Sequence, residues 1–250
     1  AALIDELLAD AGIPVWDGNR PSVLVWMVLQ NSAGDREFLT ADSNPEIVQV
    51  MQDFAAARGL PIIFPVLDFE DRKALSENVA WNLDEAVISS ASKRYGADSI
   101  LAGRLHFTAS SELVGLWQFQ FQDQAYIFDG FDSELQTYLY DPLNRITTQL
   151  ASYFAILPES IDGETIRLRI DGIKNLYAYS SLLNYVENLG LVALVTTAAV
   201  DGERIELELS LVGDARQLYE QIALDRDLLP IYNTLDESSL ATLLHYRWTR

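Results

Sequence analysis

The sequence contains no cysteine and only two histidines among its 250 residues. Disulfide bonds and thiolate nucleophiles are therefore excluded, although the lack of cysteine leaves the cellular compartment open. A zinc site would need carboxylates for half of its ligands, which is an unusual donor set for zinc. We accordingly assign no metal-binding, cofactor-binding or catalytic residue from the composition.

Basic residues are scarce. The sequence has 17 Lys and Arg against 37 Asp and Glu, a net charge of −20, and its longest basic runs are Arg72-Lys73 and Lys93-Arg94. Binding to nucleic acid depends on clustered cations that release counterions from phosphate, and anionic lipid surfaces likewise attract basic segments. We therefore expect no nucleic-acid partner and interpret the acidity as a charge that keeps a soluble protein apart from its neighbours.

Long apolar runs and glycine-rich phosphate loops are also missing. No run approaches the roughly 18 residues that a bilayer-spanning helix needs, so we expect no membrane span. Gly96 and Gly103 are too far apart for a nucleotide-binding loop, and no G-x-S-x-G elbow occurs. Gly103 lies inside a predicted strand and is expected to let a helix approach the sheet closely. The chain opens at Ala1 directly in a helical pattern (residues 3–8) without a signal peptide, which indicates a mature or trimmed form.

Hydrophobic periodicity predicts an α/β module over residues 1–157. Continuous apolar runs predict buried strands, spacings of three and four predict helices, and strict alternation predicts half-buried strands. Gly59 and Gly96 follow helical patterns and are expected to end them, Gly96 in the left-handed conformation. The predicted order is β-α-β-α-β-β-β-α, with elements near 22–29, 44–59, 60–67, 84–95, 97–106, 117–121, 125–128 and 135–154.

A second module is predicted over residues 165–230. Pro158 to Glu164 is polar and contains an Asp162-Gly163 turn signal, so it reads as a linker. Beyond it, the pattern predicts β-α-β-β-α-β, the ferredoxin-like order, with a hairpin turn at Asp201-Gly202. Residues 231–250 are expected to form a carboxy-terminal tail. The fold class predicted for the whole chain is α/β, in the sense of α+β.

Four residues are the candidates for chemistry. Asp68, Glu70 and Asp71 follow the second predicted strand, where carboxylates could bind a hard cation or act as acid and base. Arg72 and Lys73 follow directly and neutralise much of this charge, which favours a solvated loop.

His106 is the fourth candidate, and it ends a predicted strand shortly before Ser110, Ser111 and Glu112. A catalytic triad is defined by geometry and not by neighbours in sequence, so a structural histidine is favoured.

Tyrosines are numerous, and tyrosine is enriched at protein interfaces. They either cover the borders of the core or mark a binding surface. The residues concerned are Tyr126, Tyr138, Tyr140, Tyr177, Tyr179 and Tyr185.

Several motifs together resemble an uncharacterised family of exported proteobacterial proteins, known only as a domain of unknown function. They are Arg20 to Trp26, Ala57 to Pro61 with Pro65 and Asp68, and Arg94 to Asp98. The resemblance implies export, because members carry a signal peptide, and it brings no catalytic residues. More distantly, the pattern from Gly96 to Gly103 is similar to the amino-terminal domain of TolB and to CsgG-like envelope proteins. That likeness concerns fold.

We therefore expect an exported, periplasmic, non-enzymatic protein that binds another envelope protein. One alternative is a hydrolase or metal-dependent enzyme that uses Asp68, Glu70, Asp71 and His106; these side chains should then converge in a deep pocket. Another alternative is a protein that binds a small ligand between the two modules. A binding module should instead show an apolar groove or an open sheet edge.

Overall fold

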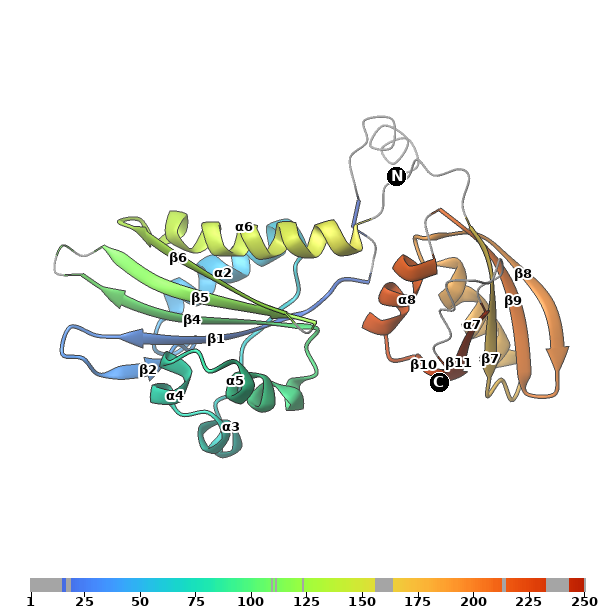
Figure 1. The fold of residues 1–250 in the computed structure, drawn as a ribbon, viewed down its shortest axis with the longest axis horizontal. Coiled ribbons are helices and arrows are strands. Elements are labelled where there is room, and N and C mark those ends of the chain that lie inside the picture. Colours follow the sequence, from blue (N-terminus) through green and yellow to red (C-terminus); the bar gives the residue numbers. More distant parts are fainter. Residues whose placement is uncertain are drawn as a thin grey trace. The chain divides into compact units, whose positions relative to one another are not determined.

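The computed structural model describes residues 15–16, 19–108, 110, 112–122, 124–155, 164–212, 215–232 and 243–249. These residues form two compact units (Figure 1): one comprises residues 21–150, and the other comprises the described residues before 21 and after 150. The helical pattern expected at residues 3–8 and the expected linker up to residue 163 lie outside the described residues. Each unit has its own sheet and core and is described by itself.

The first unit is built on a six-stranded sheet in the order β2-β1-β4-β5-β6, with β3 pairing beside β1. β1 runs parallel to β3 and β4, whereas the pairs β1–β2, β4–β5 and β5–β6 are antiparallel. The strands are β1 Val23–Gln30, β2 Arg36–Phe38, β3 Ile62–Ile63, β4 Ser99–Phe107, β5 Leu113–Phe121 and β6 Gln124–Asp132.

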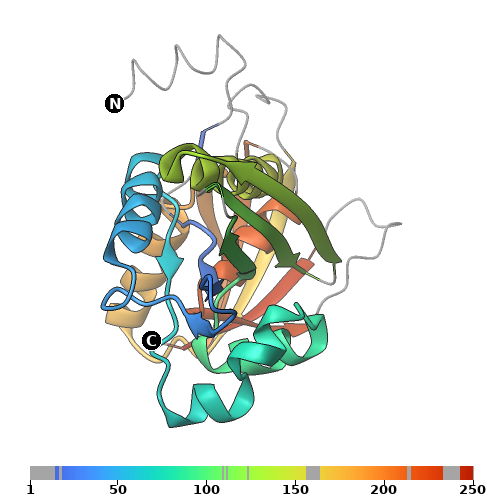
Figure 2. The ribbon, with the colours of Figure 1, turned by 90° about the vertical axis from the view of Figure 1, so that its left-hand side faces the viewer.

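Helices cover both faces of this sheet (Figure 2). On one face lie α2 and α6, and the Nε1 of Trp117 on β5 donates to the hydroxyl of Tyr138 on α6 at 3.1 Å. On the other face lie α3, α4 and α5, and Trp26 on β1 donates to Ser92 on α5 at 2.9 Å. The helices are α2 Pro45–Arg58, α3 Phe69–Ala74, α4 Glu77–Trp81, α5 Glu85–Ser92 with the short 3₁₀ helix η1 Lys93–Tyr95, and α6 Leu135–Phe154.

The α/β class is confirmed, and the first unit contains three elements that the patterns did not predict, β2, α3 and α4. The strand expected over residues 60–67 is reduced to two residues, because Pro61 and Pro65, which cannot donate to a ladder, flank it. Gly59 and Gly96 end their helices, as predicted, and both adopt the left-handed conformation that was expected of Gly96.

Gly103 has a different role from the one that the sequence suggested. It was expected to let a helix approach the sheet, but it lies opposite Trp117 on the neighbouring strand β5. A Cβ at this position would come within 2.6 Å of the Trp117 ring. The glycine therefore makes room for an indole within the sheet.

The second unit has a five-stranded sheet in the order β10-β11-β7-β9-β8. The helices α7 and α8 share a core with the inward side chains of β7 and β9, such as Leu168 and Leu207. The elements are β7 Thr165–Asp171, α7 Leu176–Glu187, β8 Val192–Asp201, β9 Arg204–Leu211, α8 Ala215–Leu224, β10 Leu228–Tyr232 and β11 Leu243–Trp248.

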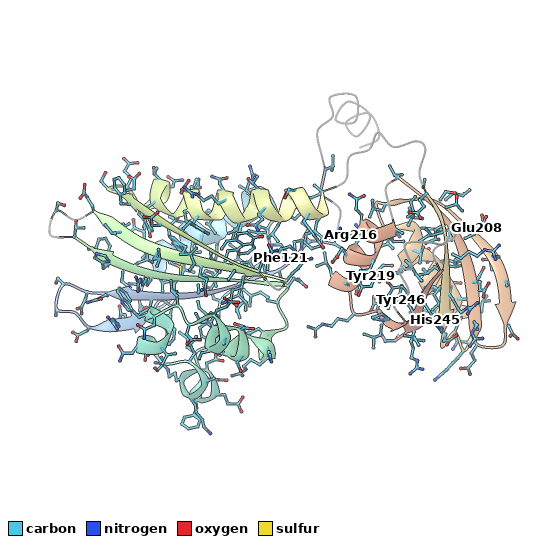
Figure 3. All side chains as sticks on the ribbon, viewed as in Figure 1. Phe121, Glu208, Arg216, Tyr219, His245 and Tyr246 are labelled. Atoms are coloured by element: carbon cyan, nitrogen blue, oxygen red, sulfur yellow. The ribbon has the colours of Figure 1, made fainter. Side chains whose placement is uncertain are left out.

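The end of the chain is not a simple tail. In the predicted ferredoxin-like arrangement the strand after the second helix closes the sheet beside the first strand. Instead, β11 occupies that place, parallel to β7, and β10 pairs with the far side of β11. Leu244, Tyr246 and Trp248 on β11 are buried, and the less buried His245 and Arg247 alternate with them. Figure 3 labels one neighbouring pair of this strand, His245 and Tyr246. This period of two is the pattern of a half-buried strand.

Among the described helices, none has the length and apolar content that crossing a bilayer requires.

Candidate functional site

The acidic residues named by the sequence lie at the start of α3 and are neutralised by Arg94 of η1. Asp68 is the N-cap of α3, and its side chain accepts from the backbone N–H of Asp71 at 3.0 Å. The two terminal nitrogens of Arg94 donate to the two carboxylate oxygens of Asp68 at 2.7 and 2.8 Å. Glu70 is farther from Arg94, at 3.6 Å, and its side chain is 79% exposed. The Arg94 guanidinium holds the pKa of Asp68 well below its usual range.

Asp71 is the centre of this network and is 1% exposed. It accepts from Arg94 at 2.9 Å, from the backbone N–H of Leu67 at 2.9 Å and from the hydroxyl of Tyr95. Burial and the bond to Asp71 raise the pKa of Tyr95 to about 12. Leu67 has a φ of +57°, a strained conformation for a bulky side chain, and the bond that its N–H donates to Asp71 helps to hold it. The carboxylates therefore serve to fix a turn.

His106 lies at the other end of β4 from this network. Arg94 and Tyr95 precede the first residue of β4, Ser99, whereas His106 is its penultimate residue and pairs with Gln30 and Val114. Seven residues of extended strand span roughly 23 Å. The four candidate residues therefore do not form one site. Within the described part of the chain, no group of three or more His, Asp or Glu side chains is arranged to hold a metal ion.

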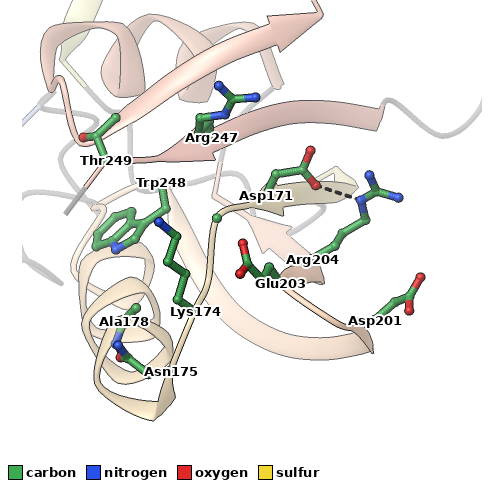
Figure 4. A pocket seen from close by; sticks show the side chains of 11 residues that line it. Asp171, Lys174, Asn175, Ala178, Asp201, Glu203, Arg204, Arg247, Trp248 and Thr249 are labelled. Atoms are coloured by element: carbon green, nitrogen blue, oxygen red, sulfur yellow. Dashed lines mark hydrogen bonds and ion pairs between the residues drawn. The ribbon is translucent and has the colours of Figure 1, made fainter.

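The second unit contains a hollow of about 870 Å³ (Figure 4). Three acids and three bases line it: Asp171, Asp201, Glu203, Lys174, Arg204 and Arg247. Arg204 donates to Asp171 at 2.7 Å, and His245 Nε2 lies 3.1 Å from the other oxygen of Asp171. The bond from Arg204 lowers the pKa of Asp171. Because the lining charges balance and partly pair with one another, the hollow does not favour a ligand of either sign.

The open edge of the first sheet is the surface most suited to binding. β6 is the terminal strand of its sheet and pairs with β5 at nine consecutive positions. Its other side carries no strand among the residues that the structure describes. Two of its apolar side chains are largely exposed, Ile127 at 63% and Phe131 at 78%. An exposed apolar strand edge is a template for pairing with another chain.

The register of the hairpin shows which backbone groups are available. Phe121 and Gln124 are partners on either side of a two-residue connection that begins with Gln122, whose φ of +55° suits a type I′ turn. With such a connection, the two residues that flank it exchange backbone hydrogen bonds with each other. Along the two strands, pairs that exchange these bonds then alternate with pairs that do not. The backbone N–H and C=O groups that point away from β5 are consequently those of Ala125, Ile127, Asp129 and Phe131.

The side chains of these four residues share one face of the sheet. Ile127 lies opposite Gln118, which donates to the carbonyl of Leu83, just before α5. Asp129 and Phe131 follow at alternate positions and therefore point to the same side, the face on which α3, α4 and α5 lie. The edge of the sheet thus offers a row of apolar, acidic and apolar side chains beside free backbone groups.

A cluster of arginine and tryptophan side chains lies on the same face of the sheet, over the strands beyond β5. The guanidinium groups of Arg36 and Arg104 lie 4.5 and 5.7 Å from the ring centre of Trp81 on α4. Arg104 also donates to the carbonyl of Trp81 at 3.1 Å, and its strand partner Leu116 pairs in turn with Asp129. Arg104 is therefore held at Trp81, two strands away from Asp129, with β5 between them.

The other sheet edges carry features that discourage pairing. β8 is also long and exposed, but its register with β9 shifts twice, between Val192 and Leu194 and between Thr197 and Ala199. β10 contains Pro230, and β2 has three residues. Bulges, proline and short length are the devices by which proteins protect strand edges. Among the described strand edges, β6 combines length, regular register and exposed apolar side chains.

No protein-family model matches this chain, and no curated protein matches it. Among solved structures, the chain is similar to the LpoB C-terminal domain from Salmonella enterica, with 13% identity, a TM-score of 0.31, and coverage of 53% of this chain and 94% of that one. It is also similar to the lipoprotein GNA1162 from Neisseria meningitidis, with 10% identity, a TM-score of 0.32, and coverage of 52% and 96%. A likeness with scores this low carries no argument about function. Membership of the exported family stays a prediction.

The sequence did not indicate where the exposed apolar side chains lie. The tyrosines proposed as an interface divide: Tyr138 is buried, whereas Tyr126 and Tyr177 are exposed. Ile127 lies within the strand predicted near residues 125–128, whereas Phe131 lies outside every predicted element. A usable signal was present, because Asp129-Gly130 and Asp132 place acids and a glycine in a strand, as is common at an edge.

Proposed function

We propose that this chain is a non-enzymatic interaction module of the bacterial cell envelope that binds an extended segment of a partner protein along β6. The partner segment adds a strand to the sheet, so that main-chain hydrogen bonds supply affinity and alternate side chains supply specificity. The observation that carries this proposal is the regular, nine-residue edge strand with Ile127 and Phe131 exposed. The envelope location rests on the sequence resemblance at residues 20–26, 57–61 and 94–98.

The enzymatic alternative lacks a comparable basis. The carboxylates of Asp68 and Asp71 accept hydrogen bonds from Arg94, and His106 lies at the far end of β4. An acid–base site needs its groups within hydrogen-bond reach of one substrate. Binding of a small ligand between the two units stays a prediction.

Site-specific crosslinking in the bacterium that produces the protein tests the proposal. A photoreactive residue at position 131 on β6 should give one discrete adduct with a second protein. The matched control is position 194 on β8, where Leu194 is also exposed, at 61%, on an edge strand. Position 194 should give no such adduct.

A second substitution shows whether strand addition is responsible. Ile127→Pro removes an N–H that points away from β5, so it leaves the ladder with β5 intact while blocking an incoming strand. The adduct from position 131 should disappear in Ile127→Pro and persist in Ile127→Val, which keeps the N–H. Equal adducts from positions 131 and 194, or an adduct that survives Ile127→Pro, would contradict the proposal.

A further inference from the structure

The centre of the β6 edge carries a carboxylate between two apolar side chains. Asp129 lies two residues from Ile127 and two from Phe131, on the same face of the strand. In the part of the chain that the structure describes, Asp129 makes no hydrogen bond or ion pair. The nearest cation along its cross-strand row, Arg104, is held at Trp81 on the far side of β5. An incoming strand would therefore meet an uncompensated negative charge midway along the edge.

We propose that β6 selects extended segments in which a lysine or arginine stands between two apolar residues at alternate positions, with the basic side chain opposite Asp129. This inference rests on the proposed function and names the chemistry of the partner. Opposite charges that face each other across two strands attract, whereas like charges repel. The pattern apolar–x–basic–x–apolar reads the same in both directions, so it fits a parallel or an antiparallel partner.

The same carboxylate disfavours a second copy of this chain as the occupant. Two copies of β6 that pair antiparallel bury their apolar groups best when Ile127 of one lies opposite Phe131 of the other. In an antiparallel pair, the numbers of two residues that lie opposite each other have a constant sum. In this register, Asp129 of one copy therefore lies opposite Asp129 of the other. Like charges directly opposite are destabilising, and repulsion of a competing partner is a source of specificity. The net charge of −20 acts in the same direction.

Selection from a display library tests the pattern. Random nonapeptides displayed on phage are selected against the full chain at low ionic strength, where exposed charges act most strongly. The enriched peptides should carry a basic residue between apolar residues at alternate positions. Against Asp129→Lys the central preference should become acidic, and against Asp129→Asn it should become neutral. Changing the central basic residue of a selected peptide to glutamate should weaken binding about tenfold.

The outcomes separate this inference from the proposed function. If selected peptides bind, lose binding in Ile127→Pro and show no basic preference, the edge accepts strands but the charge inference is wrong. If the preference is basic yet unchanged in Asp129→Lys, Asp129 is not the selecting group, and the inference is again overturned. If the selected peptides bind equally well to Ile127→Pro and to the unmodified chain, they do not use the edge and the proposed function itself fails.

Discussion

At the scale of single residues, Arg94 determines what the acidic cluster does. The sequence suggested that Arg72 and Lys73, its neighbours, neutralise Asp68 and Asp71. The structure assigns most of this role to Arg94, which lies 26 and 23 residues away and bonds to both. Arg72 instead pairs with Glu77 at 3.0 Å and donates to the carbonyl of Leu67. Composition could predict that the charge is neutralised, but the partner depends on how η1 meets the turn before α3.

Asp68→Asn tests the ion pair through the pH dependence of stability. The pKa of Asp68 in the folded state is depressed below its ordinary value of 3.8. The stabilisation is therefore present above about pH 4 and is lost as the pH falls through the lower folded pKa. The free energy of unfolding in urea should be lower for Asp68→Asn than for the unmodified chain at pH 7. The difference in the free energy of unfolding between the two proteins should become progressively smaller below pH 3.8.

Glu70→Gln is the matched control for this measurement. Glu70 belongs to the same cluster, but it lies 3.6 Å from Arg94 and is mostly exposed, so its exchange should change stability little at either pH. A gap between Asp68→Asn and the unmodified chain that is the same at pH 7 and at pH 2.5 would show that the ion pair is not its cause.

At the scale of elements, β6 shows why burial is hard to read from a strand pattern. Tyr126, Ile127 and Phe128 have the composition of a buried strand, and the sequence correctly predicts a strand there. Its position at the border of the sheet depends on which strands pair, and that is a property of contacts distant in sequence. The period-two pattern of Leu244, Tyr246 and Trp248 could likewise have indicated β11, but not its insertion between β7 and β10.

Asp129→Val tests whether the carboxylate keeps β6 from pairing with itself. When two copies of this variant pair with Ile127 of one opposite Phe131 of the other, the two valines at position 129 lie opposite each other. The apolar edge then becomes self-complementary, because no charge remains at its centre. In sedimentation velocity, the average sedimentation coefficient of Asp129→Val should rise with concentration, whereas that of the unmodified chain should stay constant.

Two further variants make this comparison specific to the edge. Asp129→Lys keeps like charges opposite each other and should not self-associate. Adding Ile127→Pro to Asp129→Val should restore the behaviour of the unmodified chain, because the outward N–H is lost. Self-association that persists in the double variant would place the contact elsewhere.

At the scale of the whole molecule, the sequence predicts class and charge better than topology. The mixed α/β class and most helix ends follow from local spacing and from glycines such as Gly59 and Gly96. The net charge of −20 excludes classes of partner that need a basic surface. The position of β6 at the border of the sheet and the role of Arg94 as partner of the acidic cluster do not follow from local patterns, because both arise where segments far apart in sequence meet.

Amide hydrogen exchange along β6 tests the central claim most directly. In the free protein the amides of Tyr126 and Phe128, which face β5, should exchange slowly, and those of Ile127, Asp129 and Phe131 should exchange quickly. When a peptide selected for the pattern is added to the full chain, the three fast amides should become protected and the other two should stay protected. If the peptide binds but the exchange of Ile127, Asp129 and Phe131 is unchanged, no strand is added at β6 and the account is wrong.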